Sequence, residues 1–156
     1  MPKHKRIIWF KDLSIKDVPR VGGKNASLGE LYNLGVPVPN GFAVTAQAYR
    51  QFLEENKLKK RISQILAKLN TDDIKNLKQS GREIRSLVLN AELPQPLVLE
   101  IKQAYHELGH RKDVAVRSSA TAEDLPGATF AGQQETYLNI VGERNLLATV
   151  LRCFAS

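Results

Sequence analysis

The chain has 156 residues, of which 42% are hydrophobic and 25% are charged, a balance typical of a soluble globular protein. Ten glycines and seven prolines are too few for a fibrous or low-complexity chain. The single cysteine excludes an intrachain disulfide and a cluster of thiolate metal ligands, and the three histidines show no spacing that predicts a zinc site.

The net charge of +7 is concentrated in two short stretches. Residues 1–11 carry four basic residues and no acidic one, and residues 50–68 carry six basic residues against two acidic ones. Such runs are usually solvated surfaces, and neither stretch has the interleaved aromatic side chains typical of nucleic-acid binding. We therefore expect no nucleic-acid partner. The two charge runs are the only argument in favour of one.

The apolar run that follows the basic N-terminus is short. It covers residues 7–10 only, which is too few for a signal peptide, and no window of the chain reaches the length of a membrane span. We expect a cytoplasmic protein with no membrane partner, in agreement with its single cysteine.

The first part of the chain predicts short strands around one helix. Residues 7–10 are typical of a strand, and residues 12–20 are expected to be a polar connection. Leucines at helical spacing predict a helix over residues 25–35, and the prolines of residues 36–41 exclude helix there. Residues 42–44 predict a second strand.

A helical segment is expected over residues 45–110. Thr45 is suited to cap its first helix. The later helices carry apolar residues three or four apart, which indicates core packing, and they are expected at residues 58–69, 71–88 and 97–108.

The character of the chain changes at Asp113. Residues 114–117 predict a strand, residues 118–129 a loop of small and polar residues, and residues 135–140 another strand. A last helix is expected over residues 145–154. Helices mixed with a few short strands predict the α+β class.

Residues 21–24, Val-Gly-Gly-Lys, are the first candidate binding element. Two glycines let a backbone approach a ligand closely, and a lysine just after them can contact phosphate oxygens. The pattern is not a P-loop, because Asn25 stands where a P-loop has Ser or Thr. The helix expected here adds free N–H groups and a positive dipole end, although a flexible turn without a ligand fits the same residues.

Arg117 is the second candidate, at the end of an apolar strand and followed by a loop rich in hydroxyl groups. A guanidinium in that position can bind phosphate through two hydrogen bonds. The alternative is a solvated loop in which Arg117 pairs with Glu123 or Asp124.

Residues 132–136, Gly-Gln-Gln-Glu-Thr, are the third candidate. Glutamine amides and a threonine hydroxyl could hydrogen-bond a base or a ribose, and an ordinary edge strand is the alternative. No nucleophile elbow surrounds the serines, and no histidine has an acidic partner at motif spacing, so the residues name no general base.

Two long blocks resemble a known family. Residues 9–11, 20–30, 35–39 and 41–43 are similar to the N-terminus of the phosphoenolpyruvate synthase (pyruvate, water dikinase) family, and residues 116–126 and 130–136 match its second block. The resemblance covers essentially the whole chain. Pyruvate, phosphate dikinase and rifampicin phosphotransferase share related blocks, so a related dikinase or phosphotransferase stays an alternative, as does a non-catalytic nucleotide-binding remnant.

The resemblance implies that residues 1–156 are the truncated N-terminal subdomain of an ATP-grasp nucleotide-binding domain. Such enzymes convert ATP, pyruvate and water to AMP, phosphoenolpyruvate and phosphate, with magnesium, through a phosphohistidine on another domain. Carried over by motif, Lys24 and Arg117 contact the ATP phosphates, while Gly132, Gln134 and Thr136 line the nucleotide site.

Family members run to many hundreds of residues. We therefore expect that the second ATP-grasp half with the magnesium ligands, the phosphohistidine domain and the pyruvate-binding barrel lie outside this chain. By this reasoning no residue here is catalytic or binds metal, and the chain alone is expected to make no phosphoenolpyruvate.

Overall fold

The computed structural model describes residues 5–121 and 135–156 and shows an α+β chain, as expected. Its strands are β1 (Ile7–Trp9), β2 (Phe42–Val44), β3 (Val114–Arg117) and β4 (Thr136–Ile140). Its helices are α1 (Val18–Val21), α2 (Gly23–Asn33), α3 (Ala46–Glu55), α4 (Leu58–Ala67), α5 (Ile74–Leu89), α6 (Gln95–Leu108) and α7 (Glu143–Ala155). Within the described part, no helix is long and apolar enough to cross a membrane.

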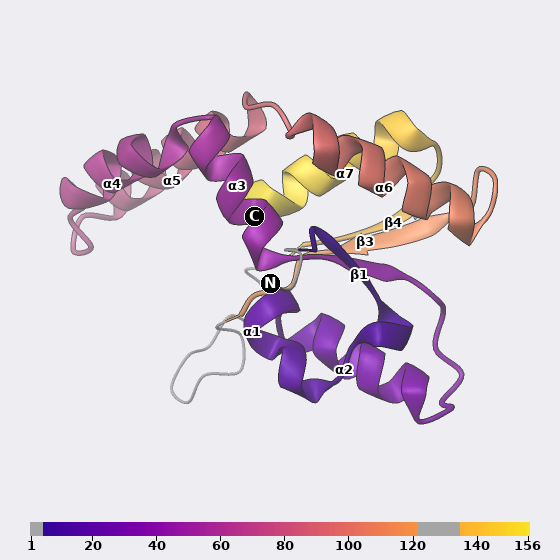
Figure 1. Ribbon diagram of the computed structural model, residues 1–156. Helices are drawn as coiled ribbons and strands as arrows, with labels where there is room; N and C mark the ends of the chain where they lie inside the picture. The colour runs from indigo at the N-terminus through magenta and orange to yellow at the C-terminus, as the bar shows by residue number, and fades with distance from the viewer. Residues whose placement is uncertain (1–4, 122–134) are drawn as a thin grey trace.

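The strands form two antiparallel pairs, β1 with β2 and β3 with β4. Successive side chains of a strand point to opposite faces. Ile8 and Ala43 therefore enter one core, while Ile7 and Val44 pack against another. Figure 1 shows the resulting layers, with α1 and α2 on one side of the strands and α6 and α7 on the other.

Three apolar clusters hold these layers together. The first joins α1 and α2 to β1 and β2, the second joins the strands to α6 and α7, and the third joins α3, α4, α5 and α7. Their buried members are, in order, Ile8, Phe10, Leu13, Val21, Ala26 and Ala43; Ala48, Leu97, Ile101, Tyr105, Leu146 and Val150; and Phe52, Leu58 and Val88.

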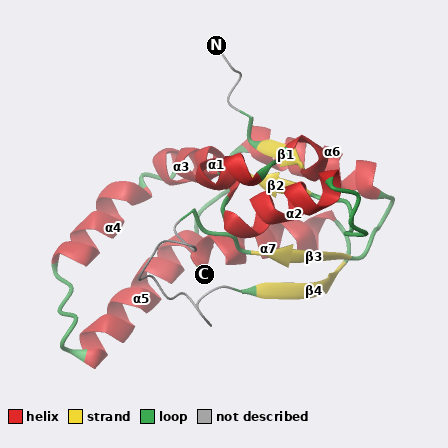
Figure 2. Cartoon of the chain, turned by 90° about the horizontal axis from the view of Figure 1, so that it is seen from below, coloured by secondary structure: helices red, strands yellow, loops and turns green. Residues whose placement is uncertain are grey.

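Helices α4 and α5 extend away from the strands, and we call residues 57–89 the arm (Figures 1 and 2). Leu58 and Val88 attach the arm to the rest of the chain by packing in the third cluster, whose aromatic members belong to α3 and α7. Phe52 of α3 is completely buried, and its ring centroid lies 5.2 Å from that of Phe154 of α7 and 6.3 Å from that of Tyr49.

The expected helix positions in the arm region agree with the structure, and so does the predicted cap. The Thr45 hydroxyl accepts a hydrogen bond from the Ala48 N–H at 3.2 Å. Asp73 caps α5 by accepting from the N–H groups of Lys75 and Asn76. Local patterning is sufficient here because each helix shows its own apolar face, and α3 and α5 also have a side-chain cap.

The prediction of a polar connection over residues 12–20 was wrong. That stretch holds two 3-10 turns, Phe10–Asp12 and Ile15–Asp17, followed by α1. Ser14 and Asp17 form a capping box at the second turn, with the Ser14 N–H donating to the Asp17 carboxylate at 2.9 Å.

Several element ends also differ from the prediction. β1 ends at Trp9, because Phe10 turns into the first core. Helix α2 begins at Gly23, two residues early, and α7 begins at Glu143, also two residues early. Both helices follow a glycine with positive φ, Gly22 or Gly142, which breaks the preceding backbone direction.

Candidate functional site

The two candidate phosphate-binding elements touch each other. The Gly23 N–H donates to the Ala120 carbonyl at 3.4 Å, and the Lys24 ammonium donates to the Ser118 carbonyl at 3.4 Å. Lys24 and Ser118 are 94 positions apart in the chain. The fold therefore places the lysine beside the residue that directly follows Arg117.

Gly22 makes this close contact possible. Its φ of +81° lies in the region that favours glycine, and it sits between the end of α1 and the start of α2. A Cβ atom built on Gly22 would lie 2.3 Å from Ser119 Oγ and 2.9 Å from the Ala120 carbonyl oxygen. Any other residue at this position would push the two elements apart. We call the contact of residues 22–24 with residues 118–120 the seam.

Arg117 stands at the end of β3, and its register partner on β4 is Thr136. The pairing continues for one more residue, because the Ser118 N–H donates to the Glu135 carbonyl at 3.0 Å. The side chains of Arg117 and Thr136 are both exposed. Arg117 makes no ion pair with a carboxylate of the described residues, and the alternative partners Glu123 and Asp124 lie outside those residues.

Two buried hydroxyl groups lie at the seam. The Oγ atoms of Ser118 and Ser119 have almost no contact with solvent, and neither has a hydrogen-bond partner among the residues of the described ranges. Buried polar atoms are nearly always hydrogen-bonded in native proteins. The seam therefore contains two buried hydroxyl groups that the described residues do not hydrogen-bond.

Helix α2 adds positive potential at the same place. Its N-terminus lies at the seam through Gly23, and its first turn contains no acidic residue. The Asn25 amide donates to the Val21 carbonyl at 2.9 Å, which fixes the end of α1 beside the start of α2. A helix N-terminus with a lysine in its first turn and an arginine on the neighbouring strand end suits an anion such as phosphate.

Of the five predicted site residues, Lys24 lies at the seam, Arg117 directly precedes it at the end of β3, and Thr136 is the register partner of Arg117. Gly132 and Gln134 lie outside the described residues. Sequence reasoning named the hydroxyl-rich loop but missed its direct contact with the glycines. The small side chains of Ser119 and Ala120, which allow close approach to Gly22, are consistent with such a contact but do not identify its partner.

The described residues near the site offer positive charge and hydrogen bonds rather than a nucleophile. Cys153 faces this end of β4, and its burial, with a further contribution from the Glu135 carboxylate, raises the thiol pKa to about 11. The thiol is therefore neutral at physiological pH. No group of three or more His, Cys, Asp or Glu residues in the described ranges is placed to hold a metal ion.

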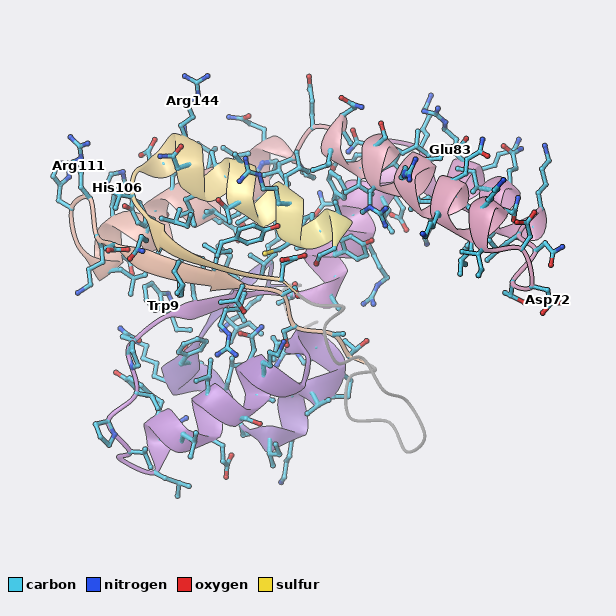
Figure 3. The ribbon with its side chains drawn as sticks, turned by 180° about the vertical axis from the view of Figure 1, so that it is seen from behind. Trp9, Asp72, Glu83, His106, Arg111 and Arg144 are labelled. Carbon is cyan, nitrogen blue, oxygen red and sulfur yellow. The ribbon has the colours of Figure 1, made fainter. Side chains whose placement is uncertain are left out.

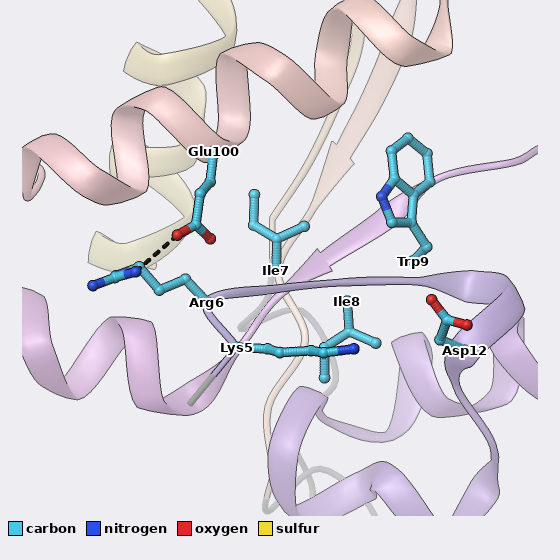
Figure 4. Close-up of a pocket in the computed structure, with 7 residues that line it drawn as sticks. All are labelled: Lys5, Arg6, Ile7, Ile8, Trp9, Asp12 and Glu100. Carbon is cyan, nitrogen blue, oxygen red and sulfur yellow. Dashed lines mark hydrogen bonds and ion pairs between the residues drawn. The ribbon is translucent and has the colours of Figure 1, made fainter. Parts of the chain in front are cut away.

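An open pocket of about 460 Å³ lies elsewhere, between β1 and α6 (Figure 4). The Arg6 guanidinium in its lining is already engaged, because it pairs with Glu100 at 2.7 Å and donates to Gln51 at 3.1 Å. It shares no residue with the seam, and its lining consists of Lys5, Arg6, Ile7, Ile8, Trp9, Asp12 and Glu100. We assign no function to it.

Comparison with known proteins supports a nucleotide site. The family model described as "Pyruvate phosphate dikinase, AMP/ATP-binding domain" matches residues 18–156. The phosphoenolpyruvate synthase of Aquifex aeolicus is 51% identical over 159 residues, which cover 96% of this chain and 19% of that protein. The phosphoenolpyruvate synthase of Neisseria meningitidis serogroup B is 52% identical over 159 residues, covering 96% and 20%. That of Pyrococcus furiosus is 44% identical over 187 residues, covering 96% and 23%. The chain thus spans about one fifth of the length of these relatives.

Proposed function

Because the chain belongs to the pyruvate phosphate dikinase AMP/ATP-binding domain family, we propose that it binds ATP at the seam. The observation that carries the proposal is the hydrogen bond from Lys24 to the Ser118 carbonyl, since it sets the ammonium beside the strand end that bears Arg117. Two cations held on separate rigid elements can contact different oxygens of one polyphosphate.

The roles follow from the chemistry of each group. Lys24 and Arg117 neutralise phosphate charge, and Thr136 offers a hydroxyl beside Arg117 on the paired strand. Gly132 and Gln134 are added to the nucleotide site because they match the family motif. The N–H groups at the start of α2 and the leftover hydroxyls of Ser118 and Ser119 are further donors that fit a phosphate group.

We propose further that residues 1–156 are the N-terminal subdomain of an ATP-grasp domain in a phosphoenolpyruvate synthase. In that enzyme ATP, pyruvate and water give AMP, phosphoenolpyruvate and phosphate. Phosphoryl transfer depends mainly on positioning and on neutralising charge, which is what Lys24 and Arg117 would contribute. Magnesium would neutralise the same phosphates, and we assign none of the described residues to it.

Calorimetric titration with ATP and magnesium tests the site. Lys24→Ala and Arg117→Ala should each weaken ATP binding by about 1.5–3 kcal/mol, the usual contribution of hydrogen bonds to charged groups. Adenosine, which lacks phosphates, should bind both variants as it binds the unmodified chain.

Lys60→Ala is the matched control, because it removes an exposed cation from the arm, away from the seam. It should leave the affinity for ATP unchanged. The proposal is wrong if the unmodified chain does not bind ATP, or if both seam variants keep its affinity.

A further inference from the structure

One face of α5 is a stripe of cations with an exposed aliphatic side chain at each end. From Lys75 onward, successive members of this face are three or four positions apart, and Ile74 lies four positions before Lys78, so they form a continuous row along the helix. The cations are all exposed, and Ile74 and Leu89 are 67% and 46% exposed. The stripe consists of Ile74, Lys75, Lys78, Arg82, Arg85 and Leu89.

The cations of the stripe repel one another. Lys78 has Lys75 and Arg82 as its helical neighbours, and Arg85 has Arg82. Like charges at this spacing destabilise a helix by about 0.2–0.5 kcal/mol per pair. None of the four cations forms an ion pair with a carboxylate in residues 5–121 or 135–156. The row of like charges therefore does not contribute to the stability of α5.

The stripe is also separate from the face that α5 uses for packing. Val88 and Ser80 are buried, and Val88 belongs to the third apolar cluster. The arm as a whole carries nine basic and three acidic residues, which is most of the excess charge of the chain. It extends from the rest of the fold, so this charge is exposed within the described part of the chain (Figures 1 and 3).

We propose that the stripe is a docking surface for an acidic amphipathic helix of another protein. Carboxylates three or four positions apart on such a helix would complement the four cations, and its apolar residues would cover Ile74 and Leu89. The stripe spans the 16 residues of α5, or about 22 Å along the axis, which matches a helix of about four turns. Charge complementarity of this kind accelerates association and fixes orientation.

The composition of the arm favours a protein partner over a nucleic acid. Residues 57–89 contain no Phe, Tyr or Trp, so the arm has no ring on which a base of a single strand could stack. Exposed aliphatic side chains at the ends of the stripe have no role against a phosphate backbone. Against a helix with leucines they bury apolar surface, which is favourable.

The test is fluorescence anisotropy with a labelled synthetic peptide of about 16 residues, with Glu and Leu at helical spacing. The 156-residue chain should bind it saturably, and less tightly as salt is raised. Charge reversal in the stripe (Lys78→Glu, Arg82→Glu and Arg85→Glu together) should weaken binding by about tenfold or more.

The control reverses the same number of charges at the opposite end of the molecule, where Figure 3 labels Arg111 and Arg144. Arg111→Glu, Lys112→Glu and Arg144→Glu together should change the affinity by less than about twofold, because these residues lie outside the stripe. Circular dichroism should show unchanged helix content in both triple variants.

The aliphatic ends are tested with Ile74→Ser and Leu89→Ser combined. This variant should weaken binding of the leucine-containing peptide and leave binding of polyglutamate unchanged. The proposal is overturned if the peptide does not bind, or if the two triple variants behave alike. Tighter binding of a DNA or RNA oligonucleotide, or of phosphatidylserine vesicles, would also overturn it and assign the stripe to that other class.

Discussion

The seam and the arm are built in opposite ways. The seam joins segments almost a hundred residues apart, and it is closed by backbone contacts against a glycine with little room for any side chain. The arm consists of consecutive helices with ordinary apolar faces, attached to the body by the third apolar cluster. A contact of the first kind depends on the individual atoms that form it. A surface of the second kind depends on its anchor and leaves most of its side chains replaceable.

Removing the anchor of the arm should have the largest effect on stability. Phe52→Ala should lower the free energy of unfolding by about 3–5 kcal/mol, because it leaves a cavity between four helices where a completely buried ring now packs. Urea unfolding followed by circular dichroism measures this change.

Leu77→Ala is the matched change within the arm. Leu77 is 45% exposed, so its truncation should cost less than about 1 kcal/mol. Equal losses in the two variants would show that the arm is held along its length and not at the third apolar cluster.

Adding a side chain to Gly22 at the seam should have the next largest effect on the free energy of unfolding. Gly22→Ala places a methyl group against Ser119 Oγ and the Ala120 carbonyl, and it also forces alanine to a φ of +81°. Together the conformational cost and the overpacking predict a loss of about 2–4 kcal/mol in thermal or urea unfolding. ATP affinity should fall as well, because Lys24 would move away from β3.

Gly35→Ala separates the conformational cost of a positive φ from the cost of overpacking. Gly35 has nearly the same φ, +79°, but a Cβ there would meet no atom within 4 Å. Its substitution should cost only about 1–2 kcal/mol, the conformational part. If Gly22→Ala is no more costly than Gly35→Ala, the contact at the seam is looser than described.

A double-mutant cycle sharpens this comparison. Ser119→Ala removes the hydroxyl that lies closest to the introduced methyl group, so it should recover part of the loss caused by Gly22→Ala. Residues in direct contact typically show coupling energies of about 0.5–3 kcal/mol. Independent effects of the two substitutions would indicate that the backbone of Ser119 and Ala120, and not the hydroxyl, limits the approach.

The difference between the two regions also explains what the sequence could predict of the fold. The arm helices were predictable because each repeats its apolar residues at helical spacing and α5 carries an Asp cap. Residues 10–21 were not, because three elements of three or four residues are too short for any periodicity to show. The Ser14–Asp17 capping box was the one local signal there.

At the site, the residue types were predictable and their proximity was not. Gly-Gly-Lys and a strand-terminal arginine indicate phosphate chemistry separately. Nothing in local spacing shows that Gly22 rests on Ser119, since that contact arises only when β3 and α2 are both in place. The family resemblance supplied the link between them, and the structure adds the atoms through which they touch.

The smallest predicted effect concerns the turn that leads into the seam. Asp17→Ala should cost about 0.5–2 kcal/mol at neutral pH, because it removes half of a capping box. Burial raises the pKa of Asp17, but the Ser14 N–H and the Arg20 guanidinium outweigh burial and hold the pKa below its usual value. A pKa lower in the folded state means that this stability is present above the unfolded pKa, about 3.9, and is lost as the pH falls through the folded value.

Unfolding curves between pH 7 and pH 2.5 should therefore show Asp17→Ala converging on the unmodified chain in acid. Arg20→Ala is the control, since it removes the ion pair at 2.8 Å and leaves the Ser14 hydrogen bond in place. It should cost about 0.2–0.5 kcal/mol at neutral pH, as expected for an exposed pair on one turn of helix. Parallel curves for Asp17→Ala and the unmodified chain would mean that the carboxylate does not stabilise this turn. The segment that leads from Ser14 to Gly22 would then be held in place by packing alone.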